Sequence, residues 1–240
     1  MCHRSVIVAA TAALAAALAL AEPARAQHTG DVVVGRTSAG RLRIGGFIPD
    51  QNIVVLPPVS GLFNGWSDNN PGFDRLVTSE PENDFHTLQS GVQVRIEVVS
   101  VDPAFMAVSS SLVIIDDPGE RILLGGSTLH AHLTWLINSN EPDFDPLKVL
   151  WRATFRLVDT GSTGYAPSDP FTFYFASTAC DRGDCNGDTV KDSLDVQAFV
   201  DILLDPAARS AAERCSADIN QDGYATLDDA SAFVDMLLAM

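Results

Sequence analysis

Two short segments near the C-terminus carry oxygen-bearing side chains at a spacing that suits a calcium ion. They are residues 184–195, DCNGDTVKDSLD, and residues 218–229, DINQDGYATLDD. Calcium in proteins takes six to eight oxygen ligands, and an EF-hand loop supplies them from positions 1, 3, 5, 7, 9 and 12. Both segments have an oxygen donor at each of these positions, with a backbone carbonyl serving at position 7. The spacing therefore predicts two calcium ions.

The predicted ligands occupy equivalent places in the two loops. In the first loop they are Asp184, Asn186, Asp188, the Val190 carbonyl, Asp192 and Asp195. In the second loop they are Asp218, Asn220, Asp222, the Tyr224 carbonyl, Thr226 acting through a water, and Asp229. Position 12 is aspartate in both loops, where an EF-hand usually has glutamate. Bidentate binding by the shorter side chain then requires the following helix to lie closer to the ion.

The two loops belong to an internal repeat. At an offset of 34 residues the loops align, and Phe199-Val200-Asp201 aligns with Phe233-Val234-Asp235. Each copy is a carboxylate-rich loop followed by a segment with helical spacing of apolar residues. Because loop and helix recur together, the repeat favours metal sites over a pair of solvated Asp-rich turns.

This arrangement resembles the dockerin family, in particular type I dockerin repeats, over roughly residues 181–240. The resemblance implies a three-helix module with residues 206–214 as the connecting helix, and an anchoring role toward a protein receptor, either cohesin-like or an envelope scaffold. The sequence departs from the family at two places. Thr189 replaces the glycine expected at position 6 of the first loop. Ser193-Leu194 and Leu227-Asp228 replace the hydroxyl pair with which cellulosomal dockerins contact cohesin, so the receptor is left open.

Three cysteines lie in or next to the repeat, at positions 180, 185 and 215. In an oxidising compartment they allow one disulfide and leave one thiol. We predict a bond between Cys185 and Cys215, because it ties the two copies of the repeat together. Cys180–Cys215 is the alternative.

A pair of histidines is the second feature with metal chemistry. His130 and His132 alternate in a predicted strand, residues 129–137, so their side chains share one face of it. Two histidines on one face are the beginning of a zinc or copper site, and His86 is a third candidate ligand. Such sites need three or four convergent ligands, so we favour the simpler interpretation of a polar outer strand face.

The elements that must position these residues are strands in the first part and helices in the second. Residues 92–98 and 151–157 alternate apolar and polar side chains, and turn-forming clusters separate the runs. The predicted strands are 31–34, 41–47, 52–56, 92–98, 108–115, 129–137, 151–157 and 170–176. We expect an all-β sandwich or jelly-roll domain over residues 27–179, followed by a small α-helical calcium-binding module over residues 180–240.

The N-terminus has the pattern of a secretory signal peptide. Arg4 precedes an apolar run from Val6 to Ala21, and Ala24-Arg25-Ala26 forms a small-x-small cleavage site. We expect cleavage after residue 26, no membrane-spanning segment in the mature chain, and a location outside the cell or at its envelope. The formal net charge of −16 disfavours nucleic acid and anionic membranes as partners.

The sequence contains no linear catalytic signature such as a Gly-x-Ser-x-Gly elbow or a phosphate loop. The favoured function is a secreted, non-catalytic protein anchored through its calcium-binding module. The alternative is a β-sandwich that binds a small ligand, a metal or a glycan and is anchored in the same way. Paired glycosidase carboxylates have no linear motif, so a glycan-active domain belongs to this alternative. Trp66, Trp135 and Trp151 are its candidates for a carbohydrate face, although tryptophan more often packs in a core.

Overall fold

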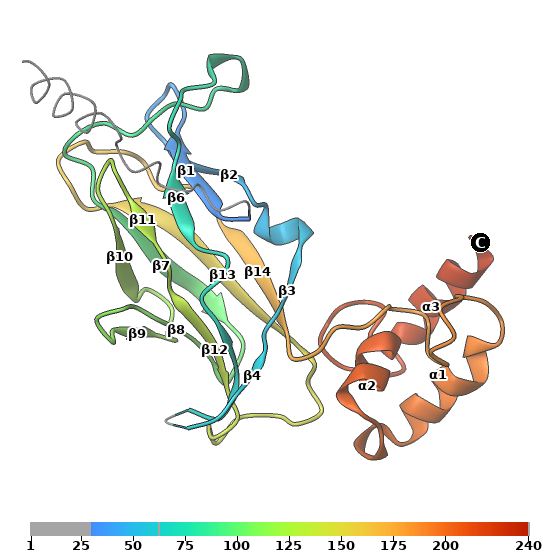
Figure 1. Ribbon diagram of the computed structural model, residues 1–240. Helices are drawn as coiled ribbons and strands as arrows, with labels where there is room; N and C mark the ends of the chain where they lie inside the picture. The colour runs from blue at the N-terminus through green and yellow to red at the C-terminus, as the bar shows by residue number, and fades with distance from the viewer. Residues whose placement is uncertain (1–29, 62, 240) are drawn as a thin grey trace, which may run out of the picture.

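The computed structural model describes residues 30–61 and 63–239 (Figure 1). The signal peptide predicted for residues 1–26 lies outside these residues. Among the residues described, no helix has the length and apolar character needed to cross a membrane.

The described residues of the first part of the chain form three β-sheets. The first sheet has the order β11 (His130–Ala131), β6 (Phe73–Arg75), β1 (Val32–Arg36) and β2 (Leu42–Gly46). The second has the order β10 (Arg121–Gly125), β7 (Val94–Val101), β13 (Leu150–Asp159), β14 (Phe171–Ala176) and β3 (Ile53–Val55). The third has the order β4 (Pro58–Val59), β5 (Gly65–Asp68), β12 (Thr134–Asn138), β8 (Phe105–Val108) and β9 (Ile114–Ile115).

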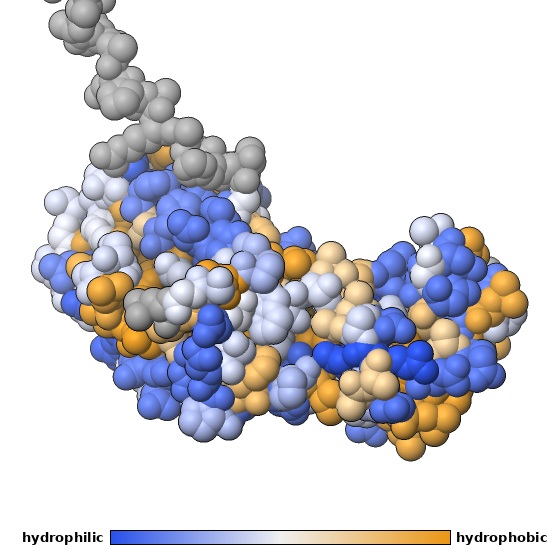
Figure 2. Space-filling view, turned by 60° about the horizontal axis from the view of Figure 1, so that its bottom comes forward, coloured by the Kyte–Doolittle hydropathy of each residue, from blue (hydrophilic) through white to orange (hydrophobic). Residues whose placement is uncertain are grey.

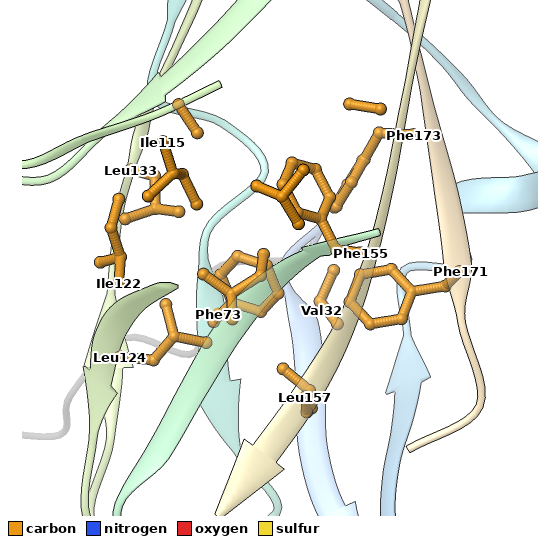
Figure 3. Close-up of a cluster of buried hydrophobic side chains, with 14 of the residues drawn as sticks. Val32, Phe73, Ile115, Ile122, Leu124, Leu133, Phe155, Leu157, Phe171 and Phe173 are labelled. Carbon is orange, nitrogen blue, oxygen red and sulfur yellow. The ribbon is translucent and has the colours of Figure 1, made fainter. Parts of the chain in front are cut away.

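One hydrophobic core joins the three sheets into a sandwich. The alternation of β13 places Phe155 and Leu157 in this core, fully buried. Figure 3 shows Phe155 and Phe173 of the second sheet facing Phe73 of the first. Burying each large apolar side chain contributes roughly 1.5–3 kcal/mol, so the predicted β-sandwich architecture follows from the period-two pattern.

Two of the predicted strands are each divided in the structure. The range 108–115 contains only the last residue of β8, then a turn and β9, so most of β8 was not predicted. The turn is at Ser109–Leu112, where Leu112 has a φ of 62° and its N–H donates to the Ser109 carbonyl. Residues 129–137 give β11 to the first sheet and β12 to the third. Strands β4, β5, β6 and β10 were not predicted, since they are short or lie among turn-forming residues.

The second part of the chain, described over residues 180–239, contains three α-helices there, α1 (Asp195–Leu204), α2 (Ala211–Ala217) and α3 (Asp229–Leu238), and a short 3-10 turn, η3 (Pro206–Ala208). Phe199 and Phe233, which occupy the same position in the two repeats, stack with ring centroids 4.1 Å apart at its centre. The expected helix over residues 206–214 begins later, because Ser210 caps α2 and forms a capping box with Glu213.

The helical part is attached at the end of the sandwich where β14 leaves it (Figure 1). The Val149 N–H donates to the Gly223 carbonyl at 2.9 Å, and the Arg214 guanidinium donates to the Pro146 carbonyl at 2.9 Å. The second loop therefore lies against the residues that lead into β13.

Candidate metal centres

The aspartate at position 12 closes each loop in the same way. Asp195 accepts hydrogen bonds from the backbone N–H groups of Asn186 and Asp192, at 3.0 and 2.9 Å. Asp229 accepts from Asn220 and Thr226, both at 2.9 Å. Both carboxylates are buried and begin a helix, α1 or α3. Each one thus ties positions 3 and 9 of its loop to the start of the following helix.

Positions 3, 5 and 7 also repeat their hydrogen bonds. In the first loop the Asn186 side-chain oxygen accepts from Asp188 N–H at 2.8 Å, and the Asp188 carboxylate accepts from Val190 N–H at 2.9 Å. The equivalent bonds in the second loop, Asp222 N–H to Asn220 and Tyr224 N–H to Asp222, measure 2.8 and 3.0 Å. These side-chain to backbone bonds are local, so the same residue types at the same spacing give the same loop shape.

The first position differs between the loops. Asp184 is half-buried, and its two oxygens accept from Gly187 N–H at 2.9 Å and Thr189 N–H at 3.0 Å. Asp218 is fully buried, and its Oδ2 has no hydrogen-bond partner among the described residues. The Arg182 guanidinium lies 3.6 Å from that oxygen. A buried carboxylate oxygen without a partner is costly unless a cation neutralises it.

Burial also changes the acidity of the second loop. It raises the pKa of Asp218 to about 6, although the nearby Arg182 charge acts in the opposite direction. Burial raises the pKa of Asp229 as well. Both shifts show that this loop holds its carboxylates away from water, where a divalent cation would stabilise the charged forms.

Both loops require left-handed backbone at positions 4 and 6. Gly187 and Thr189 have φ values of 77° and 71°, and Gln221 and Gly223 have 60° and 102°. Each loop therefore has glycine at only one of the two positions. Thr189 therefore occupies a left-handed conformation, which is unfavourable for a β-branched residue.

The closest grouping of metal-ligating side chains lies elsewhere. Within the ranges 30–61 and 63–239, Asp31, His130 and His132 are the one group of three carboxylate, imidazole or thiol residues whose ligand atoms all lie within 4.8 Å of one another. The carboxylates of the two loops do not converge to that degree. The asparagine amide oxygens and backbone carbonyl oxygens of the loops are further possible ligands that this grouping does not include.

The two histidines predicted to share a face do lie together, with ring centroids 5.2 Å apart. His86 does not join them, and its Nε2 lies 3.3 Å from an Asp84 oxygen. Asp31 takes the third place in the group. Sequence reasoning missed it because no local pattern relates an aspartate before β1 to histidines about a hundred positions away.

The cysteines pair in the alternative way. The disulfide joins Cys180 and Cys215, with Cα atoms 5.9 Å apart, so the prediction of a Cys185–Cys215 bond is wrong. Cys185 is buried beside Phe199 and Ala217 in the small hydrophobic core, and its burial raises the thiol pKa to about 11. Its place at position 2 of the first loop directs it inward, where an unreactive thiol packs as an apolar group.

Comparison of the chain with protein-family models, with curated proteins and with solved structures finds no match.

Proposed function

We propose that residues 180–240 form a calcium-binding interaction module of the dockerin type, which anchors the β-sandwich to a protein partner outside the cytosol. The observation that carries this proposal is the repeated hydrogen-bond frame of the two loops. Positions 3, 5, 7, 9 and 12 have the same partners in both copies, and each copy ends on a helix. Oxygen ligands at these positions suit calcium.

Exposed apolar side chains at matching positions of the two helices support an interaction role. Leu204 and Leu238, at the ends of α1 and α3, are 78% and 80% exposed. Val200 and Val234 are also exposed, one turn earlier. Figure 2 shows hydrophobic residues on the surface of the helical part. Exposed apolar residues that recur with the repeat fit a partner protein with an apolar surface, and the net charge of −16 favours basic groups around it.

The first experiment is a calorimetric titration of the mature chain with calcium. We expect two sites in the unaltered protein and one site in each of Asp195→Asn and Asp229→Asn. Asp201→Asn and Asp235→Asn are the matched controls, since these aspartates lie on the helices outside the loops. At a hundredfold excess over Kd, each ion stabilises the fold by roughly 2.7 kcal/mol. An unaltered protein that binds no calcium would refute the proposal.

The second experiment tests docking. Retention of the chain on a cell-envelope extract should require calcium and should be lost in Leu204→Lys combined with Leu238→Lys. Val77→Lys, at an exposed valine of the β part, is the control. Retention that survives both chelator and the paired substitution would contradict an interaction through this module.

A carbohydrate-binding face receives less support. Trp135 and Trp151 are 0% and 1% exposed and pack in the core. Trp66 is half-buried and stacks on Phe144, with ring centroids 6.1 Å apart. Two of the three tryptophans therefore have no surface to offer to a sugar ring.

A further inference from the structure

We propose that Asp31, His130 and His132 form a binding site for a divalent transition metal ion, most of all zinc. The site lies at the end of the first sheet where β1 begins. This inference is independent of the calcium-binding module. Asp31 directly precedes β1, His130 lies on β11, and His132 follows β11. Strand β6 pairs with both β1 and β11, so the sheet brings the three residues to one end of adjacent strands.

The separation of the ligand atoms suits a metal of this size. All three residues offer ligand atoms within 4.8 Å of one another, and the Asp31 Oδ2 lies 3.8 Å from the His132 Nε2. Zinc bonds of about 2.0–2.2 Å in tetrahedral geometry place two ligand atoms about 3.3–3.5 Å apart. To complete the coordination, the pair at 3.8 Å would close by about half an ångström, and a pair at the 4.8 Å limit would close by about 1.4 Å.

The carboxylate of Asp31 gives an independent indication of a cation. Asp31 is only 5% exposed. Oδ1 accepts a hydrogen bond from the Gly72 N–H at 2.9 Å, whereas Oδ2 has no hydrogen-bond partner in the described part of the chain. Leaving a buried charged oxygen without a hydrogen-bond partner costs more than leaving a neutral group unpaired. A bound metal ion removes that cost.

The surroundings of His132 select the nitrogen that faces the site. The His132 Nδ1 lies 2.9 Å from the Asn69 carbonyl and donates to it, which leaves Nε2 toward Asp31. The turn that carries Asn69 is held by a hydrogen bond from the Trp135 indole to the Pro71 carbonyl, at 3.0 Å. A side chain at Gly72 would lie 2.6 Å from the His132 ring, so this glycine leaves room for the imidazole.

A second carboxylate lies near His130. Asp74 lies opposite His130 in the pairing of β6 with β11, and its Oδ2 is 3.8 Å from the His130 Nδ1. Asp74 is 6% exposed. We regard it as a positioning residue, because a carboxylate behind a ligating imidazole orients the ring and increases its basicity. Its negative charge also favours a cation nearby.

The donor set selects the class of metal. Two imidazole nitrogens and one carboxylate suit zinc or copper, whereas calcium and magnesium prefer sites made of oxygens. Three protein ligands leave a fourth coordination position for water or a small anionic or neutral donor. The site therefore differs in chemistry from the two loops of the helical part.

The test is a titration of residues 27–240 with zinc. Excess calcium is present, because it occupies the two loops and limits zinc binding there. We expect one zinc ion per chain. Asp31→Asn, which preserves the shape of the side chain, and His132→Ala should each weaken zinc binding about a hundredfold or more, since loss of an outer-shell group alone costs 10–100-fold. His86→Ala is the matched control and should bind zinc normally.

Cobalt supplies a second readout, because visible absorption reports nitrogen and oxygen coordination directly. The spectrum of the unaltered chain with cobalt should be lost in Asp31→Asn and retained in His86→Ala. If His132→Ala fails to fold, as judged by circular dichroism without metal, His130→Ala replaces it, since the His130 side chain is 36% exposed. Absence of stoichiometric zinc, or equal zinc affinity in Asp31→Asn and the unaltered chain, would overturn the proposal.

Discussion

The two loops have the same internal hydrogen bonds and very different surroundings. Residues 186–190 of the first loop are exposed to solvent. The second loop lies against the β-sandwich. The Gly223 carbonyl accepts from Val149 N–H at 2.9 Å, and the Gln221 carbonyl accepts from the Arg152 guanidinium. The ammonium of Lys148 lies 5.2 Å from the centre of the Tyr224 ring.

This difference accounts for the glycine at position 6 of the second loop. Position 6 of the second loop is Gly223, and a Cβ there would lie 2.5 Å from the Leu150 carbonyl oxygen. Position 6 of the first loop is Thr189, which is exposed, so its side chain meets no such obstacle. The repeated residue types set the backbone shape of both loops. Contact with the β-sandwich then limits which side chains the second loop can accept. By linkage, calcium in the second loop and contact with the sandwich should stabilise each other.

The largest effect is expected from matched glycine substitutions. Gly223→Ala adds both left-handed strain and a clash with the Leu150 carbonyl, so it should lower the free energy of unfolding by more than about 2 kcal/mol. Gly187→Ala adds only strain, because nothing lies within 4 Å of its Cβ, and should cost about 1 kcal/mol. Urea unfolding in calcium measures both. Equal losses would mean that the contact with the sandwich does not constrain the second loop.

Replacing the other two left-handed residues by glycine should have a smaller effect, which concerns the affinity of each loop for calcium. The left-handed conformation of Thr189, a β-branched residue, costs about 1–2 kcal/mol of strain. Thr189→Gly should therefore increase the calcium affinity of the first site by up to about tenfold. Gln221→Gly should change the second site by less than about threefold, since the added chain entropy of glycine offsets a milder strain. Calorimetric calcium titration distinguishes the sites. No change in Thr189→Gly would show that Thr189 does not limit the first site.

Removing the arginine contact tests the linkage between the second loop and the sandwich. Arg152→Ala removes the hydrogen bond to the Gln221 carbonyl and should weaken calcium binding in the second loop by about three- to tenfold. The first site should be unaffected. Arg95→Ala, on β7, is the control, because its guanidinium bonds to Thr160 instead. A similar loss at both sites would argue against a local link.

The smallest effect concerns the helix that leads into the second loop. The Ser210 N–H donates to the Glu213 carboxylate at 2.8 Å, and this bond lowers the pKa of Glu213 below its ordinary value of 4.5. A depressed folded-state pKa gives stability that is present above the unfolded value and is lost as the pH falls through the folded value. Because the Glu213 side chain is 43% exposed, Glu213→Gln should cost only about 0.5 kcal/mol at pH 7.

That difference between Glu213→Gln and the unaltered chain should shrink as the pH falls below 4.5. Paired urea unfolding at neutral and acidic pH measures it, with Glu82→Gln, at an exposed position, as the background. A difference that stays constant with pH would show that the charge of Glu213 has no part in the cap.

The features that rest on local pattern could be predicted from the sequence alone. The alternation of residues 151–157 gave β13 its buried face, and the spacing of residues 184–195 and 218–229 gave the two loops their matching hydrogen bonds. The helices after the loops follow from the same repeat. These features depend on neighbours within about ten positions, so side-chain type and spacing are enough to specify them.

The features that join distant parts of the chain depend on the tertiary structure. It paired Cys215 with Cys180, because Cys185 packs inward beside Phe199. It divided the strand predicted over residues 129–137 between two sheets and brought Asp31 to His130 and His132. It set the second loop against the sandwich while the first stayed exposed. Contacts of this kind depend on how whole sheets and helices pack, and a local pattern of residue types carries no information about that packing.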